Sequence, residues 1–311
     1  MGLVKDPQRV EAIAENIADA RAVKGRSLWQ DAMGRFFHNK AAVGSLIILV
    51  SILIFTIVGP FFAVWSNEEI DWSRMADVAE LGRPSIENGH FFGLDELGRD
   101  LYSRTIQGTL TSLMVGVVGA LVAVVIGTLY GAVSGFIGGW VDNAMMRTVD
   151  ILISIPYMFV LILLMVMFER SLLMLFVGIG LLSWLDMSRI VRGQTLSLKH
   201  KEFIEAARAA GVGWFVIVVR HIMPNLMGVV VVYATLLVPG MIMAESFISF
   251  LGLGVQEPNT SLGALISDGA GTILYDQVWQ LGIPLAFFLT IVISLFFIGD
   301  GLRDALDPKD R

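Results

Sequence analysis

Long stretches without Asp, Glu, Lys or Arg constrain the fold of this chain more than any other feature. The longest covers residues 105–141, and five shorter ones share its character. The hydrocarbon core of a bilayer is about 30 Å thick and needs about 20 apolar helical residues to cross it. Hydrophobic residues make up 55% of the 311 positions and charged residues only 16%, too few to cover one soluble core. Most of the chain is therefore expected in lipid, which excludes disordered and fibrous proteins and almost all soluble enzymes.

The charge-free stretches predict an all-α membrane protein with six transmembrane helices. The fourth stretch, Leu172–Leu185, is short, because so few residues rise only about 21 Å as a helix. It is expected to continue to about Ile190, which places Asp186 and Arg189 at the membrane edge. The expected spans are 41–65, 110–136, 149–168, 172–190, 225–247 and 281–299.

The distribution of Lys and Arg predicts which side each connecting segment lies on. With six spans and an inner N-terminus, all six lysines and most of the arginines fall in inner segments, as the positive-inside rule requires. Both termini are then cytoplasmic, as is the loop 191–224, while the loops 66–109 and 253–280 lie outside. We expect a cytoplasmic N-terminal region over 1–40, with no cleaved signal peptide, and a transmembrane domain over 41–311.

Two amphipathic segments precede the first span. Residues 8–24 have a weak apolar face, and the next segment places Trp29, Met33, Phe36 and Phe37 on one side of a helix. Basic residues surround this second apolar face, which predicts an interfacial helix lying under the membrane. An ordinary cytosolic helix is the alternative.

Small residues form a stripe along the second span. A stripe of this kind lets another helix backbone approach closely in lipid, so it predicts a packing seam, either within this subunit or with a partner. The stripe consists of Ser112, Gly116, Ala120, Ala123, Gly127, Gly131 and Gly135.

The third and fifth spans carry features that a solute path could use. Pro156 is expected to bend the third span, in which Met158 and Met165 offer a flexible thioether surface to varied solutes or simply face lipid. Pro239-Gly240 predicts a break in the fifth span. Glu245 follows in apolar company, where a carboxylate is either functional or located at the outer interface.

The sequence contains no chemistry that could drive transport by itself. It has no phosphate-binding loop, no metal-ligand spacing among its four histidines, no Ser-nucleophile elbow and no cysteine. Its spans also lack a ladder of charged residues. We therefore expect no cofactor in this chain, which either conducts passively or is driven by another protein.

The loop between the fourth and fifth spans contains a short predicted helix over 199–211, ended by Gly211. Its alanines are small, so the groove of another protein could approach closely. Phe203 and Ile204 are large apolar side chains that could insert into such a groove. The pattern favours a cytosolic helix offered to a partner. A helix packed on its own subunit is the alternative.

This segment resembles the EAA loop of permease subunits of ABC importers. Glu205-Ala206-Ala207 is followed after three residues by Gly211, and twelve further residues lead to Pro224. The match is partial before that proline, where His221 and Met223 replace the usual Ile and Leu.

Four other segments resemble peptide permeases of the same family. They cover 25–32, 92–104, 247–258 and 299–308, with Leu94 where the family has Thr. The first resembles the C-type subunit of oligopeptide permeases in particular. Together the five segments extend the resemblance over roughly residues 25–311.

The resemblance implies a type I importer permease with six transmembrane helices in the inner (plasma) membrane. A B-type permease subunit would pair with it, and two cytosolic ATPases, which bind the ATP and Mg, would dock beneath. An extracytoplasmic binding protein would deliver peptide to the outer loops, and nucleic acid has no part. By position, the residues that couple to the ATPases are Glu205, Ala206, Ala207 and Gly211, with Phe203 and Ile204 beside them.

Other functions remain open from the sequence. A dipeptide, glutathione or nickel importer of the same family would share these motifs. An ion-driven secondary transporter would need charged membrane-embedded groups or repeats that the chain lacks, and a structural membrane subunit would have no solute path.

Overall fold

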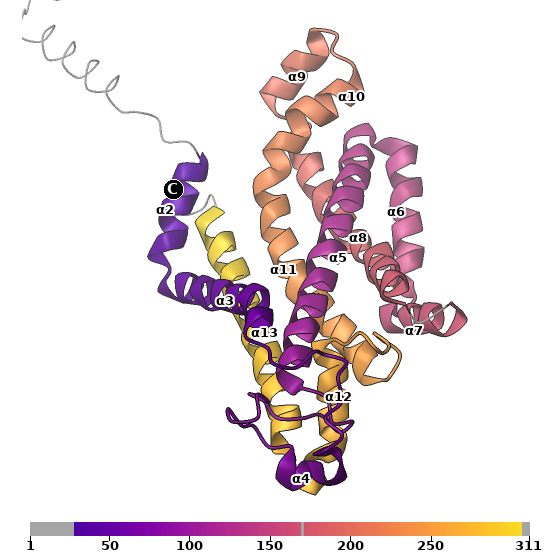
Figure 1. Cartoon of the computed structure of the whole chain (residues 1–311). Coiled ribbons are helices and arrows are strands. Elements are labelled where there is room, and N and C mark those ends of the chain that lie inside the picture. The colour runs from indigo at the N-terminus through magenta and orange to yellow at the C-terminus, as the bar shows by residue number, and fades with distance from the viewer. Residues whose placement is uncertain (1–27, 169–170, 307–311) are drawn as a thin grey trace, which may run out of the picture.

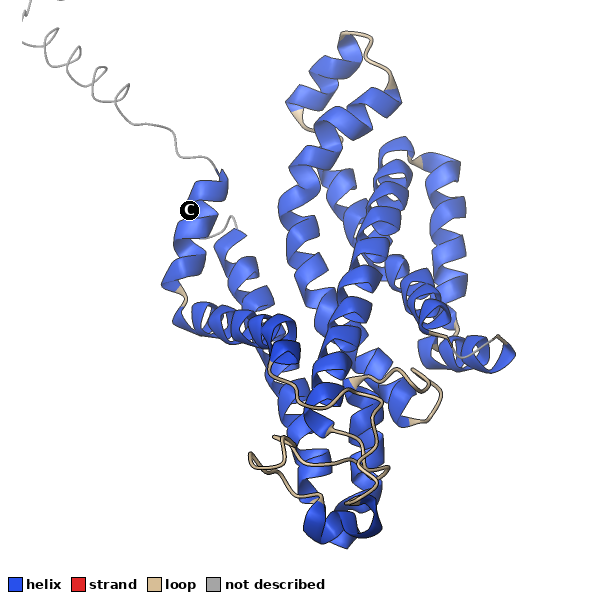
Figure 2. Ribbon diagram, viewed as in Figure 1, coloured by secondary structure: helices blue, strands red, loops and turns tan. Residues whose placement is uncertain are grey.

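The computed structural model describes residues 28–168 and 171–306, and this part of the chain consists of helices joined by loops (Figures 1 and 2). The helix expected over 8–24 lies outside the described residues. The elements are α2 (Leu28–His38), α3 (Lys40–Val58), η1 (Gly59–Phe61), η2 (Met75–Asp77), α4 (Val78–Leu81), α5 (Leu101–Ile137), α6 (Gly139–Ser154), α7 (Tyr157–Met167), α8 (Leu172–Leu198), α9 (Glu202–Ala209), α10 (Trp214–Ile217), η3 (Val218–Ile222), α11 (Met223–Phe250), α12 (Leu262–Thr272), η4 (Ile273–Tyr275) and α13 (Val278–Leu306).

Five helical segments of the described chain are long and apolar enough to cross a membrane. They contain α3, α5, α8, α11 and α13, and the pair α6–α7 makes a sixth span if it is counted as one. The axes of α6 and α7 differ by 75°. The bend follows from Pro156, which has no N–H to donate and disfavours a helical conformation at the residue before it. The predicted bend at this proline is confirmed.

The stripe of small residues on α5 is a seam within the subunit, formed against α8 and α11. A Cβ atom added at Gly131 would lie 2.3 Å from the carbonyl oxygen of Ser188, and one at Gly127 would lie 2.8 Å from that of Trp184. At the other end of the stripe, Gly116 faces Ile242 of α11. Backbones this close gain dispersion contacts along their whole length. The seam therefore holds the centre of the molecule together.

Several helices extend beyond the predicted spans, among them α5 and α8. The helix α5 begins at Leu101 because the Asp100 side chain accepts a hydrogen bond from Ser103 N at 2.9 Å and caps it. The helix α8 continues to Leu198, beyond the end expected at about Ile190.

The predicted break at Pro239-Gly240 is wrong, because α11 runs unbroken from Met223 to Phe250. A proline inside a helix removes one backbone hydrogen bond, and in a packed membrane helix the neighbouring turns can tolerate that loss. Pro239 is buried, where the packing of α11 against α5 and α13 keeps the helix in place.

The two ends of the molecule are different in kind. The short helices α9 and α10 form one end, while α4, α12 and long loops form the other (Figure 1). The helix α2 and the end of α13 lie together, in the half of the molecule nearer to α9 (Figure 1). Phe36 of α2 packs against α13, whereas Trp29, Met33 and Phe37 are exposed. The sequence predicted that all four side chains form one apolar face of an interfacial helix. In the structure Phe36 is buried, so only the other three of these side chains are exposed on α2.

Candidate functional site

The predicted coupling helix is α9, which forms a hairpin with α10 between α8 and α11. The side chain of Ile204 is 0% exposed and lies in a core cluster with Ile217, Ile222 and Phe136. Ala207 is half-buried and packs against the same cluster. Ile204 therefore anchors α9 to its own subunit, because a partner cannot reach a side chain that is fully covered.

The opposite face of α9 is bare. Glu205 and Ala206 are exposed, and Phe203 is 43% exposed. Gly211 follows the helix with φ of 76°, a left-handed conformation that disfavours other residues. Its N–H donates to the carbonyl oxygen of Arg208 at 2.9 Å, which ends the helix as predicted from its sequence.

Two aromatic residues of the same hairpin are also exposed, and the sequence analysis did not single them out. Trp214 and Phe215 of α10 are 51% and 62% exposed, and their rings contact each other. Large apolar side chains exposed beside one another mark interaction surfaces. The signal in the sequence was Trp-Phe directly after Gly213, at the start of a short helix. We call Phe203, Ala206, Trp214 and Phe215 the α9–α10 face.

Besides the buried cluster around Ile204, two further features connect the hairpin to the spans. The Arg208 guanidinium lies 4.7 Å from the centre of the Phe136 ring, a cation–π contact that joins α9 to the end of α5. The π-helical turn η3 lies directly before Pro224. Proline cannot donate a hydrogen bond and its ring crowds the preceding turn, which a wider turn relieves. Arg208 and η3 thus link the hairpin to α5 and to α11.

Glu245 is buried between α5, α11 and α12, with 0% of its side chain exposed. Its carboxylate accepts hydrogen bonds from Ser112 at 2.8 Å, from Ser249 at 2.7 Å and from Ser246 at 3.2 Å. The Ser112 hydroxyl also accepts from the backbone N–H of Leu262 at 3.2 Å. This cluster joins three helices within the subunit, since a buried carboxylate needs hydrogen-bond donors around it.

The two methionines proposed to line a path lie in different surroundings. Met165 is 1% exposed and packs in a core cluster with Leu161, Ile179 and Met241. Met158 is half-buried against the same cluster. These contacts fix α7 against α8 and α11, so the structure brings neither methionine together with Glu245 in one open site.

A module at the far end from α9 is built on buried charges. We call residues 62–100 and 251–277, which contain α4 and α12, the α4–α12 module. Asp95 accepts from Arg99 Nε at 2.8 Å and forms an ion pair with Arg104 Nε at 3.1 Å. Arg99 also pairs with Glu257 at 2.6 Å. Burial disfavours the charged guanidinium, but these carboxylates outweigh it and raise the pKa of Arg99.

His90 forms a second polar centre in the same module. Its ring nitrogens lie 2.9 Å from Asp100 and 3.4 Å from Asp71, and its ring stacks on Trp65. Burial raises the pKa of Asp100, although hydrogen bonds from His90 and Ser103 oppose the shift. The segment 92–104, which resembles peptide permeases, therefore acts as a scaffold, with Asp95 and Asp100 as its acceptors.

An all-helical, multispan fold with an exposed hairpin between two spans is that of a membrane transport subunit. The sequence matches the family of binding-protein-dependent transport system inner membrane components over residues 123–311. It also matches the N-terminal TM domain of oligopeptide transport permease C over residues 27–81. The chain belongs to the family of binding-protein-dependent transport system inner membrane components, and is thus a permease subunit of an ABC transport system.

Relatives with assigned names align over nearly the whole chain. The oligopeptide transport system permease protein OppC of Escherichia coli K12 is 58% identical over 96% of this chain and 96% of its own length. The protein of the same name from Haemophilus influenzae is 53% identical over 99% and 96%. The dipeptide transport system permease protein DppC of Bacillus subtilis is 42% identical over 96% and 91%.

The fold is similar to that of a solved transporter. An inward-facing structure of the MetNI methionine ABC transporter aligns with a TM-score of 0.53 and 20% sequence identity. The alignment covers 65% of this chain and 95% of the other. At this identity the similarity concerns the fold alone.

Proposed function

We propose that this chain is the C-type translocation subunit of an ATP-driven importer for oligopeptides. The observation that carries the proposal is the 58% identity, over 96% of both chains, to a permease named for oligopeptide transport. The match of residues 27–81 to the N-terminal domain of oligopeptide permease C supports the same subunit type. In this proposal a B-type permease subunit completes the path, and both termini are cytoplasmic.

The α9–α10 face is the proposed docking surface for the cytosolic ATPases. Its exposed aromatic and small side chains can enter an apolar groove, while Ile204 and Ala207 hold the helix on its own subunit. ATP and Mg would be bound by the ATPases, and closure of the two ATPases would move α9 as a rigid element. The contacts of Arg208 with α5 and of η3 with α11 support transmission to the spans.

The α4–α12 module is the proposed landing surface for a peptide-loaded binding protein. It lies at the end opposite to α9 (Figure 1), and its buried ion pairs make it rigid enough to receive a partner without rearranging. Trp72, Ile86 and Leu274 are its most exposed large apolar side chains, at 73%, 84% and 92%. Exposed aromatic side chains such as that of Trp72 are enriched in protein interfaces.

The test is reconstitution of the chain with a B-type permease, the ATPases and the binding protein in proteoliposomes. We expect these components to copurify and peptide-loaded binding protein to stimulate ATP hydrolysis and uptake of a labelled tripeptide. Ion-driven uptake by the chain alone, without an ATPase, would contradict the proposal.

A dipeptide importer is the second candidate. It is favoured by the 42% identity to a permease named for dipeptide transport. Competition between di-, tri- and pentapeptides for uptake in the same proteoliposomes decides between the two.

A further inference from the structure

A carboxylate on α8, within the predicted fourth span, has no ion-pair partner in the described parts of the chain. Three charged residues follow one another along α8 at Asp186, Arg189 and Arg192. Arg189 pairs with Asp150, and Arg192 pairs with Asp142, both on α6. Within the described parts of the chain Asp186 has no ion-pair partner, and its side chain is exposed.

The depth of Asp186 follows from its neighbours. It lies 14 residues after Leu172, or about 21 Å along the helix. The next residue, Met187, lies against Gly127 of α5, within the predicted second span. A carboxylate at this depth is costly against lipid and normally faces a water-filled path or a counter-charge. The surface around Asp186 is therefore not a lipid-facing one.

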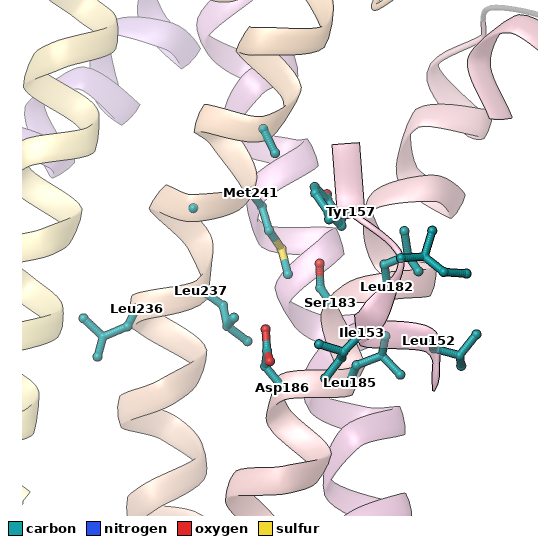
Figure 3. Close-up of a pocket in the computed structure, with 13 residues that line it drawn as sticks. Leu152, Ile153, Tyr157, Leu182, Ser183, Leu185, Asp186, Leu236, Leu237 and Met241 are labelled. Atoms are coloured by element: carbon teal, nitrogen blue, oxygen red, sulfur yellow. The ribbon is translucent and has the colours of Figure 1, made fainter. Parts of the chain in front are cut away.

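Asp186 lines a pocket between the α6–α7 bend, α8 and α11. Figure 3 shows Asp186 and Ser183 of α8 and Leu237 and Met241 of α11 projecting toward the same space. The pocket has a volume of about 290 Å³, and Asp186 is the one charged residue among those that line it. This volume is at the lower limit of ligand sites, so it suits one end of a peptide and not a whole one.

We propose that this pocket receives the N-terminal residue of a peptide in transit, with its α-ammonium group donating to the Asp186 carboxylate. The inference rests on the proposed function as a peptide importer. Peptides of any sequence share the α-ammonium, so a single carboxylate among apolar walls binds them without selecting side chains. The leucine and methionine side chains around it accommodate varied first residues.

The experiment uses the reconstituted complex with its permease partner, ATPases and binding protein. Two tripeptides carry a photoactivatable leucine, at the first or at the third residue, and both keep a free amino terminus. We expect the first-residue probe to crosslink to this chain at α8 or α11, and the third-residue probe not to do so there. In D186N, crosslinking of the first-residue probe and kcat/KM for uptake should each fall about tenfold, the effect of one hydrogen bond to a charged group.

Two further variants separate a binding role from a structural one. D186E keeps the charge and should restore most of the crosslinking, whereas D304N removes an exposed carboxylate at the end of α13 and should match the wild type. D186N should still fold, because no described residue of this chain pairs with Asp186.

The possible results are distinguishable. Unchanged crosslinking and uptake in D186N, or equal crosslinking of both probes, would overturn the inference while peptide import stands. Loss of the B-type subunit from purified D186N would also overturn it, since Asp186 would then pair with a cation of that subunit. A wild-type complex that takes up no peptide would overturn the proposed function itself.

Discussion

The α4–α12 module and the α9–α10 hairpin lie at the two ends of one molecule and are stabilised in opposite ways. The module buries Asp95, Arg99 and His90 in loops and holds them with ion pairs and hydrogen bonds. The hairpin is anchored by the buried side chains of Ile204 and Ile217 and leaves aromatic side chains exposed. Loops with little regular structure need directional polar contacts to hold one shape. A short helix that must meet a partner needs only an anchor and a free face.

The largest effect is expected from Asp95→Ala in the α4–α12 module. It leaves the buried Arg99 and Arg104 without their shared acceptor, and breaking a buried ion pair costs about 3–5 kcal/mol. Denaturant unfolding of the purified chain in detergent measures the loss. Glu96→Ala removes the exposed carboxylate next to it and should change stability by less than about 0.5 kcal/mol. Equal stability of the two variants would show that the network is not what holds the module.

Ile204→Ala should damage the hairpin and spare the module. The side chain is fully buried, and such truncations cost about 2–5 kcal/mol. Because α9 is a separate short element, we expect the loss as local opening, seen as faster hydrogen exchange in α9 and α10. Phe203→Ala, at the exposed neighbour, serves as the control. Faster exchange in α12 as well would mean that the two ends are not independent.

Ala206→Trp should leave stability unchanged and weaken docking. The residue is exposed, so the described part of the chain leaves room there for a large ring, which prevents close approach of a partner. We expect at least about a tenfold weaker association with the ATPases, or about 1.4 kcal/mol, with normal membrane insertion. Ala206→Ser keeps the side chain small and should bind as the wild type does. Wild-type association of the tryptophan variant would place the docking surface elsewhere.

The smallest effect is expected from Glu257→Gln, which also tests the module. Glu257 is 58% exposed, although its partner Arg99 is only 9% exposed and retains Asp95. An ion pair open to solvent contributes about 0.2–1 kcal/mol, and salt should reduce the difference further. Unfolding at low and high ionic strength provides the comparison. A loss as large as that of Asp95→Ala would make Glu257 a full member of the buried network.

Parts of the site could be predicted from the sequence, but the burial of single residues could not. Phe203 and Ile204 are adjacent and similar in character, yet one is exposed and the other buried, because helical rotation about α9 turns only one toward the core. Glu245 and Met165 stood out in the sequence as unusual residues in apolar spans. Their contacts come from α5, α12 and α8, which no local pattern specifies.

Local chemistry by itself determined the membrane class, the bend at Pro156 and the glycine that ends α9. Each depends only on residues close in sequence. Apolar stretches determine the membrane class, and the restricted or unusual φ of proline and glycine determines the bend and the helix end. Only the tertiary structure decided that Pro239 leaves α11 intact, that the small-residue stripe packs within the subunit, and that Asp186 faces a pocket. These depend on which helices lie side by side. Packing against neighbouring helices can compensate the hydrogen bond that Pro239 removes. Whether a charge such as that of Asp186 is paired depends on the residues that other helices bring next to it.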